Sequence, residues 1–360
     1  MRFRLAVASA VVVAAGLVSC AGNSQPANAM CAGTTPNSQV VVYSTTGLEY
    51  WYSDTFSTFQ QTCKVAISYF GAPSSDVLTR LQTEQSAPLA DIAVMFPPYL
   101  TAAADAGLIG GTPGAADVPA DRCDPGRRWC EVAEDYVSWV YNPGLVSPPP
   151  TRWSDLLASR FAGMVVTSGP DVPIGLADVL LLRHEMGDAG AFNFLTQLEA
   201  STAAHYTVTD TMSRVVAEGG ALVANGDLQE DLNDIPQYQY VAIWFPTVEG
   251  GTPTTIALPY GAALVRGGHN AGNARALLAY LWSSAAQSLV GEVFAAPAVP
   301  SAVQVDPRSA KVAAELSGVN IIRPDWEAVA ALAPSVTSRY DALRSAPYGV
   351  SVPPTTVPVP

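Results

Sequence analysis

Short apolar stretches of strand character alternate with helical patterns along the first third of the chain. Residues 40–43 are apolar or aromatic throughout and predict a strand, and the pattern over residues 47–62 predicts a helix. Apolar positions alternate in residues 64–70, which predicts a second strand, and the apolar side chains of residues 77–81 fit a second helix. Residues 91–95 predict a third strand before another helix. Three such units in about 70 residues indicate a parallel α/β sheet.

Hydroxyl side chains cluster where three of the predicted strands end, and one more stands at the start of a later helix. In open α/β sheets, ligands bind beyond the carboxyl ends of strands, and free N–H groups at helix N-termini favour anions. Serine and threonine at such points also serve as ordinary helix caps, so a cap without a ligand is the alternative. The predicted ligand-binding residues are Ser44, Thr45, Thr46, Ser74, Ser75, Thr167, Ser168 and Thr211.

The triple proline at residues 148–150 separates this first unit from a second stretch of strands and helices. A chain of this length exceeds one ordinary domain and suits two. Helices are predicted over residues 153–161, 176–186, 189–198, 271–282 and 285–294, and strands over residues 136–141, 164–167, 221–224, 240–245, 255–258 and 262–265.

The first 20 residues predict the compartment. Two arginines precede an apolar run over residues 5–17, which is too short for a comfortable membrane span and has the form of a secretory signal. The run leads directly into Leu-Val-Ser-Cys20, which resembles a bacterial lipobox. We therefore predict a lipoprotein signal peptide over residues 1–19, a lipidated Cys20, and a flexible tether over residues 20–38. A plain secretory signal with an incidental Cys20 is the alternative, and no transmembrane helix is predicted.

The formal net charge of the chain is −13, from 18 basic and 31 acidic residues. Removing residues 1–19 deletes two arginines and leaves 16 basic residues, so the mature charge is 16 − 31 = −15. This charge argues against nucleic acid as a partner, because phosphate binding needs a basic surface. A small anion remains compatible, because local N–H groups and hydroxyls hold it.

Four cysteines remain after Cys20, an even number in an oxidising compartment, which predicts two disulfides. Three pairings are open, and we favour Cys31–Cys63 with Cys123–Cys130, because the second pair closes a short local loop. A zinc site is the competing interpretation, but the spacings contain no Cys-x-x-Cys pair. We predict no metal site and no cofactor.

Catalysis has little support in the sequence. A hydrolase needs a nucleophile, a base and an orienting acid, and no Gly-x-Ser-x-Gly elbow is present. The three histidines, His184, His205 and His269, lie in separate segments. We predict that the protein is not an enzyme, with an extracytoplasmic hydrolase as the alternative.

Five short motifs, in order over residues 40–300, resemble those of family 1 extracellular solute-binding proteins. Residues 141–146, YNPGLV, resemble the strand exit of that family, and residues 150–157, PTRWSDLL, resemble its P-x-x-W-x-D-L helix start. Residues 248–253, VEGGTP, resemble its late turn, and residues 275–287 resemble its A-R-x-F-I-x-F-L-x-S-x-E-A-Q helix pair. Residues 297–300, PAVP, match the turn that follows.

The resemblance implies a type II periplasmic-binding-protein fold, with two α/β lobes, each a mixed mostly parallel sheet flanked by helices, and a ligand between them. We expect residues 39–138 plus 255–345 in the first lobe, residues 139–254 in the second, and a proline-rich tail over residues 346–360. Residues 136–141 and 240–245 are the expected hinge strands. The resemblance also implies a monomer that feeds the permease subunits of an ABC importer, held at the outer face of the cytoplasmic membrane by its lipid alone.

The nearest subgroup binds ferric iron, thiamine, polyamines or 2-aminoethylphosphonate. The hydroxyl-rich strand exits favour an anion or zwitterion such as a phosphonate or phosphate ester. A polyamine or thiamine is the main rival, because such cations need carboxylates and aromatic faces. Ferric iron is disfavoured, because the family's adjacent tyrosine pair is replaced by the separated Tyr238 and Tyr240. Residues that could hold a cation are Glu49, Tyr50, Trp51, Trp244 and Glu249.

Overall fold

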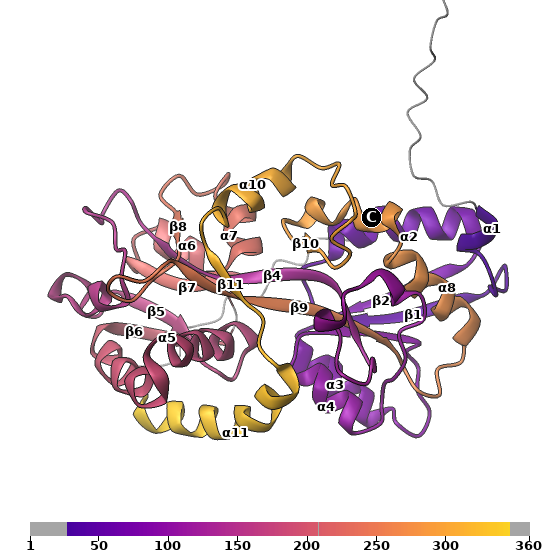
Figure 1. The fold of residues 1–360 in the computed structure, drawn as a ribbon, viewed down its shortest axis with the longest axis horizontal. Coiled ribbons are helices and arrows are strands. Elements are labelled where there is room, and N and C mark those ends of the chain that lie inside the picture. Colours follow the sequence, from indigo (N-terminus) through magenta and orange to yellow (C-terminus); the bar gives the residue numbers. More distant parts are fainter. Residues whose placement is uncertain (1–26, 208, 346–360) are drawn as a thin grey trace, which may run out of the picture.

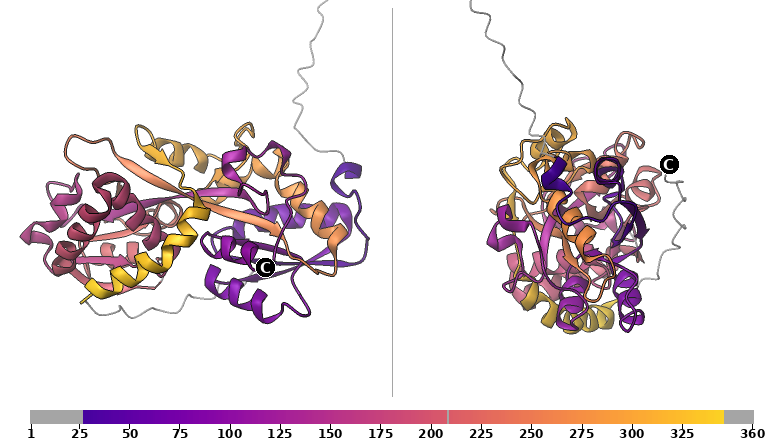
Figure 2. Two further views of the ribbon diagram at one scale, coloured as in Figure 1. Left: turned by 60° about the horizontal axis from the view of Figure 1, so that its bottom comes forward. Right: turned by 90° about the vertical axis from the view of Figure 1, so that its right-hand side faces the viewer.

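The computed structural model describes residues 27–207 and 209–345, which form two α/β lobes side by side (Figures 1 and 2). The predicted signal peptide, Cys20 and the proline-rich tail lie outside the described residues. Within the described ranges, no helix is both long and apolar enough to cross a membrane. The two-lobed α/β fold confirms the predicted fold class.

The first lobe is built on three parallel strands in the order β2-β1-β3, as the strand–helix alternation predicted. Helix α2 buries Trp51, Phe56 and Phe59 against this sheet, so these side chains are the apolar anchors that its pattern indicated. The elements are β1 (Gln39–Ser44), α2 (Glu49–Cys63), β2 (Ala66–Gly71), α3 (Ser74–Thr83), β3 (Ile92–Met95), α4 (Tyr99–Asp105), η1 (Ala115–Asp117), η2 (Ala120–Arg122), α8 (Ala271–Leu281), α9 (Ser284–Gln287), η6 (Val290–Val293) and β10 (Ala296–Pro297).

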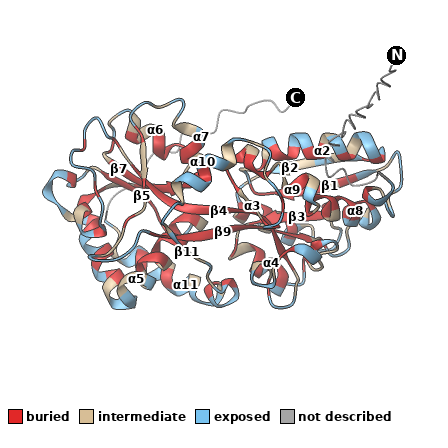
Figure 3. Cartoon of the chain, turned by 45° about the horizontal axis from the view of Figure 1, so that its top comes forward, coloured by how far each residue is buried: buried red, intermediate tan, exposed pale blue. Residues whose placement is uncertain are grey.

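Two long strands, β4 (Cys130–Tyr141) and β9 (Thr254–Leu264), run through both lobes and are buried almost throughout (Figures 1 and 3). β9 pairs with β3 of the first lobe at one end and with β11 at the other. β4 pairs with β9 through its first half and with β7 of the second lobe through its second half. These antiparallel strands connect the lobes.

The predicted hinge pair is therefore half wrong. Residues 136–141 belong to β4, but residues 240–245 hold only the short β8 (Ala242–Trp244), which pairs with the end of β4 inside the second lobe. The second crossing strand is β9, which the sequence had divided at Pro259. Proline interrupts most strands, yet here it lies near a register shift between Glu131 and Ala133 of the partner strand, where a proline is tolerated.

The second lobe packs helices around β5, which lies between β6 and β7 and is parallel to both. Helix α5 is interrupted at Gly187, whose φ of 71° and ψ of 166° separate the two predicted helices. Residues 153–161 form two 3₁₀ segments in place of the expected α-helix. The elements are η3 (Trp153–Leu157), η4 (Ser159–Phe161), β5 (Val165–Ser168), α5 (Pro173–Leu198), η5 (Glu199–Ser201), β6 (Thr202–Tyr206), α6 (Met212–Ala217), β7 (Val223–Asp227), α7 (Leu228–Asp234) and β8.

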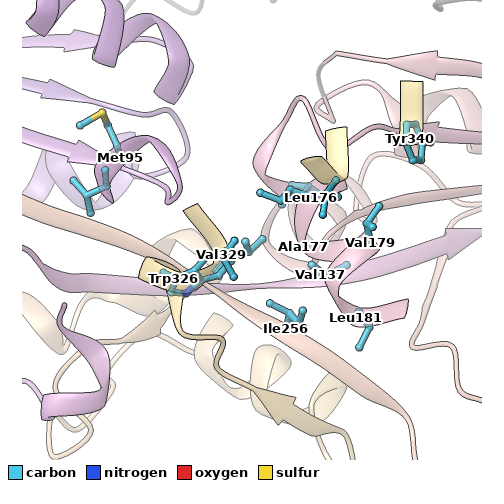
Figure 4. Close-up of a cluster of buried hydrophobic side chains, with 14 of the residues drawn as sticks. Met95, Val137, Leu176, Ala177, Val179, Leu181, Ile256, Trp326, Val329 and Tyr340 are labelled. Atoms are coloured by element: carbon cyan, nitrogen blue, oxygen red, sulfur yellow. The ribbon is translucent and has the colours of Figure 1, made fainter. Parts of the chain in front are cut away.

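The last part of the described chain crosses between the lobes through α10 (Arg308–Glu315), β11 (Asn320–Ile322) and α11 (Trp326–Leu343). Helix α11 packs against α5 of the second lobe and α4 of the first. Its Trp326 and Val329 join one core cluster with Met95, Val137 and Leu176, which come from the two lobes and β4 (Figure 4).

Both favoured disulfides, Cys31–Cys63 and Cys123–Cys130, are present. The Cys31–Cys63 disulfide shows that the predicted flexible tether over residues 20–38 was drawn too long at its C-terminal end. Helix α1 (Ala27–Met30) packs against α2 and α8, and Cys31 is bonded to the end of α2. Residues 27–38 therefore belong to the folded body, because this covalent bond and the burial of Met30 hold them there.

Candidate functional site

The three strand exits of the first lobe share one edge of the sheet. Ser44 at the end of β1 pairs with Gly71 of β2 and Val94 of β3. The Thr45 N–H donates to the Val94 carbonyl over 2.8 Å, and the Ala72 N–H donates to the Ser44 carbonyl over 3.1 Å. The parallel register thus brings the hydroxyl-bearing loops after these strands together.

Within this edge, the predicted hydroxyls differ in accessibility. The buried Ser44 hydroxyl donates to the Thr45 carbonyl over 2.7 Å and lies 3.1 Å from the Tyr52 hydroxyl. The buried Ser74 hydroxyl accepts a hydrogen bond from the Phe96 N–H over 3.0 Å. Thr45 is also buried, whereas Thr46 is exposed and Ser75 is half-buried. Thr46 and Ser75 are therefore the predicted hydroxyls of this lobe that a solute can reach.

In the second lobe, a chain of hydrogen bonds fixes the exit of β5. The Ser168 N–H donates to Asn225 Oδ1 over 2.7 Å, and Asn225 Nδ2 donates to Asp178 Oδ2 over 3.4 Å. The other carboxylate oxygen of Asp178 accepts from the Trp139 indole over 3.0 Å. Burial raises the pKa of Asp178 to about 7. This chain connects the predicted Ser168 to the crossing strand β4.

Thr167 contributes to a buried hydroxyl–imidazole–carboxylate arrangement that the sequence did not indicate. Its Oγ1 lies 3.0 Å from Nδ1 of His205, whose Nε2 lies 3.1 Å from the Glu199 carboxylate. The Tyr340 hydroxyl of α11 lies 3.2 Å from the same Nδ1. A nucleophilic triad uses this order of groups, but His205 is only 1% exposed and Thr167 only 4%. The arrangement joins α11 to the sheet and offers no accessible nucleophile.

Thr211 directly precedes α6 and differs from the other predicted residues in its hydrogen bonding. It is only 8% exposed, and its hydroxyl has no hydrogen-bond partner among the described residues. A buried hydroxyl without a partner costs about 1–3 kcal/mol. A solute that reaches Thr211 would recover this free energy by bonding to it.

Several carboxylates lie close together at the start of α7, a group that the sequence alone did not indicate. Asp135 of β4 and Asp227, the N-cap of α7, are both buried, and Asp231 lies one turn further on. Burial raises the pKa of each, with the neighbouring Asp227 adding to the effect on Asp135 and Asp231, and Asp231 reaches about 8. Burial and Asp227 also hold the pKa of Glu230 well above its usual range. Within residues 27–207 and 209–345, no salt bridge pairs these four acids with a basic side chain.

The β1 exit of the first lobe meets the start of α7 of the second. Gln229 Nε2 donates to the Gly47 carbonyl over 2.5 Å, and Gln229 Oε1 accepts from the Tyr260 hydroxyl over 2.6 Å. Thr46 therefore lies one residue from a direct contact between the lobes. A second contact joins the Tyr99 hydroxyl to the Asp171 carbonyl over 2.9 Å. These bonds join other residues than the predicted hydroxyls, whose role in binding stays a prediction.

Apart from Glu49, whose carboxylate accepts from the Gly47 N–H over 2.8 Å, the residues considered for a cation or iron are dispersed. Trp51 and Trp244 are buried in core clusters, and Tyr50 and Tyr240 are exposed. Glu249 is exposed and pairs with Arg152 over 3.4 Å. Within the described ranges, no group of three His, Cys, Asp or Glu side chains is placed to hold a metal ion. By contrast, the carboxylates near α7 lie close together, since Asp227 raises the pKa of Asp135, Glu230 and Asp231.

Residues 87–331 match the family model described as bacterial extracellular solute-binding protein. A protein of Salmonella paratyphi A, named as a 2-aminoethylphosphonate-binding periplasmic protein, is 31% identical over 313 residues, which cover 84% of this chain and 91% of the relative. A protein of Salmonella typhimurium with the same name matches with the same identity and coverage.

Solved structures share the fold at low sequence identity. A ferric binding protein from Campylobacter jejuni has a TM-score of 0.72 at 17% identity, covering 84% of this chain and 99% of that one. The periplasmic binding protein AfuA from Actinobacillus pleuropneumoniae, solved with fructose-6-phosphate bound, has a TM-score of 0.71 at 17% identity, covering 85% and 96%. At such identities the likeness establishes the fold alone.

Proposed function

The chain belongs to the bacterial extracellular solute-binding protein family, and we propose that its solute is a small zwitterion of the 2-aminoethylphosphonate class, bound between the lobes. As a member of this family, the protein is the extracytoplasmic solute-binding component of an ABC importer. The phosphonate would lie against the N–H and hydroxyl groups of the strand exits. The ammonium group would face the carboxylates at the start of α7.

The observation that supports this assignment is that hydroxyl and N–H donors of the first lobe and carboxylates of the second lobe lie near the same contact between the lobes. The β1 exit with Thr46 reaches the start of α7 through the Gly47–Gln229 bond. The α7 side supplies Asp227 and Glu230. Burial raises the pKa of both carboxyl groups, and repulsion by Asp227 raises the pKa of Glu230 further. An ammonium ion placed there would relieve this repulsion, because an opposite charge within about 4–6 Å favours the ionised carboxylate.

Ligands that carry both charges of the zwitterion, or only one of them, test the proposal. Isothermal titration should detect binding of 2-aminoethylphosphonate, and ethylphosphonate, which lacks the amine, should bind at least about tenfold more weakly. Each hydrogen bond to a charged group contributes about 1.5–3 kcal/mol, and about 1.4 kcal/mol is a factor of ten. Binding of putrescine or thiamine without any phosphonate would replace the assignment with the cationic alternative.

Thr211→Val tests the second-lobe hydroxyl with little risk to folding, since this hydroxyl has no bond to a described residue that could be lost. We expect affinity for 2-aminoethylphosphonate to fall about tenfold, while the free energy of unfolding without solute rises by about 1–3 kcal/mol, because valine removes the buried hydroxyl that has no partner among the described residues. Thr101→Val is the matched control, because Thr101 of α4 is also buried with an unpartnered hydroxyl. Equal affinity of the two variants would remove Thr211 from the site.

Glu230→Gln tests the ammonium subsite. The change should weaken 2-aminoethylphosphonate about tenfold and leave ethylphosphonate unaffected, because only the first ligand carries the amine. Glu218→Gln, an exposed acid of the same lobe, serves as the control. An equal loss for both ligands would assign Glu230 a structural role.

Anchoring and oligomeric state belong to the same proposal. We propose that a lipid on Cys20 holds the protein at the outer face of the cytoplasmic membrane, because the apolar run leads directly into Leu-Val-Ser-Cys. Cys20→Ala should move the protein from the membrane to the soluble fraction. We also expect a monomer in size-exclusion chromatography and no turnover of generic ester or sugar substrates.

A further inference from the structure

Gln229 connects all three parts of the fold with one buried residue. From the first turn of α7 in the second lobe, its side chain donates to Gly47 of the first lobe over 2.5 Å and accepts from Tyr260 of the crossing strand β9 over 2.6 Å. Its main-chain N–H donates to Asp135 of the other crossing strand, β4, over 3.1 Å. Gln229 and Tyr260 are both almost fully buried. Both ends of the side-chain amide are thus satisfied by protein groups.

Gly47 has the shape that this contact requires. Its φ of 111° is in the region that favours glycine, and a Cβ here would lie 2.1 Å from the Tyr260 hydroxyl oxygen and 3.2 Å from Gln229 Oε1. The Gly47 N–H donates to Glu49 Oε2 over 2.8 Å, and Glu49 Oε1 accepts from the Tyr69 hydroxyl over 2.9 Å. The first lobe therefore holds the acceptor carbonyl in place through its own contacts.

We propose that Gln229 is a positioning residue that latches the two lobes together and holds the β1 exit in its binding position. Both side-chain bonds of the latch are made between protein groups, so they stabilise the closed arrangement of the lobes even without solute. The inference rests on the proposed function only in that the solute binds between the lobes. A protein whose competent state is already populated binds solute more tightly, in proportion to that population.

The size of the effect follows from the two bonds. Each contributes about 0.5–1.5 kcal/mol net, so together they shift the ratio of closed to open lobes by roughly 5- to 150-fold. Gln229→Ala removes both bonds, and Tyr260→Phe removes one while keeping the ring. Gly47→Ala leaves all donors and acceptors in place but drives a methyl group into the Tyr260 hydroxyl.

Small-angle X-ray scattering of the mature protein without solute tests the latch directly. We expect the radius of gyration to rise in Gln229→Ala and Gly47→Ala, and to rise less in Tyr260→Phe. Gly111→Ala is the control, because Gly111 has a similar φ of 100° but no atom within 4 Å of an added Cβ, so it adds backbone strain without a clash. Circular dichroism confirms that each variant is folded.

The same variants should bind 2-aminoethylphosphonate more weakly by the factor measured for the closed population, with Gly111→Ala unchanged. Identical radii for wild type, Gln229→Ala and Tyr260→Phe without solute would overturn the latch. The scattering result does not depend on the identity of the solute. If 2-aminoethylphosphonate fails to bind while the radii change as expected, the ligand assignment fails and the latch remains.

Discussion

The pH dependence of stability should reveal Asp178, the centre of the hydrogen-bond chain behind Ser168. Burial is the largest cause that raises its pKa, from 3.8 to about 7, against the opposing bonds from Trp139 and Asn225. Because the native pKa exceeds the unfolded value, the native state keeps this proton to higher pH. The stabilisation is therefore complete below pH 3.8 and is lost as the pH rises to about 7. A shift of about 3 units at about 1.4 kcal/mol each corresponds to about 4 kcal/mol.

Asp178→Asn isolates this contribution. The asparagine oxygen can accept from Trp139, but its NH₂ group then faces the Asn225 amide, which costs about 1–3 kcal/mol at every pH. At about pH 4 the variant should be less stable than wild type by that amount. By about pH 8 the difference should have moved by about 4 kcal/mol in favour of the variant, because the variant has no buried charge to form.

Urea unfolding followed by circular dichroism, at several pH values between about 4 and 8, measures this difference. Other titrating groups are present in both proteins and largely cancel in the comparison. Asp117→Asn, a change at an exposed acid, should give a curve parallel to that of wild type. If the Asp178→Asn curve is also parallel to wild type over this range, the reasoning about burial is refuted.

Three further changes test the packing around the lobes. Glu134→Gln should cost about 3 kcal/mol in urea unfolding, because the fully buried carboxylate bonds to Arg323 over 2.7 Å and Arg122 over 3.3 Å, whereas the exposed Glu249→Gln should cost less than about 1 kcal/mol. Replacing Cys31 and Cys63 by serine should lower the free energy of unfolding by about 1 kcal/mol more than replacing Cys123 and Cys130, since the closed loops span 32 and 7 residues. Thiol titration of the denatured, unreduced wild-type protein should find no free thiol. Gly175→Ala should lower the melting temperature by a loss of about 1–3 kcal/mol, because its Cβ would lie 2.0 Å from the Gly169 carbonyl oxygen, and an unchanged melting temperature would contradict this close approach.

The elements that the sequence predicted well are those with a local cause. The first three strand–helix units follow from alternation and amphipathic spacing, and their helices and strands lie within a few residues of the expected positions. The division of β9 at Pro259 failed for a non-local reason, because Pro259 lies beside an irregular pairing with β4 that the local sequence does not reveal. The connection between the lobes was misassigned for the same reason, since it depends on which strands pair over long sequence separations.

The candidate site divides in a similar way. Hydroxyls after strands can be recognised locally, and the parallel register does bring the first-lobe exits together. Their accessibility could not be predicted, because it depends on distant partners such as Tyr52 for Ser44 and Phe96 for Ser74. The carboxylates around α7 were missed because Asp135 and Asp227 meet only through the pairing of β4 with β7. Their one local signal was the position of Asp227 directly before a helix.

Net charge and local chemistry select different properties of a solute. With a formal charge of −13 over the whole chain, the protein repels a free phosphate dianion at long range, whatever the strand exits could offer it. The ammonium group of an aminophosphonate offsets one charge of its phosphonate, so this repulsion is reduced before contact is made. In the proposed site the ammonium group would face Asp227 and Glu230, whereas a phosphonate without an amine would leave the repulsion of Glu230 by Asp227 unrelieved. The acidic composition and the hydroxyl-rich exits therefore favour the same class of ligand, one that carries both charges close together.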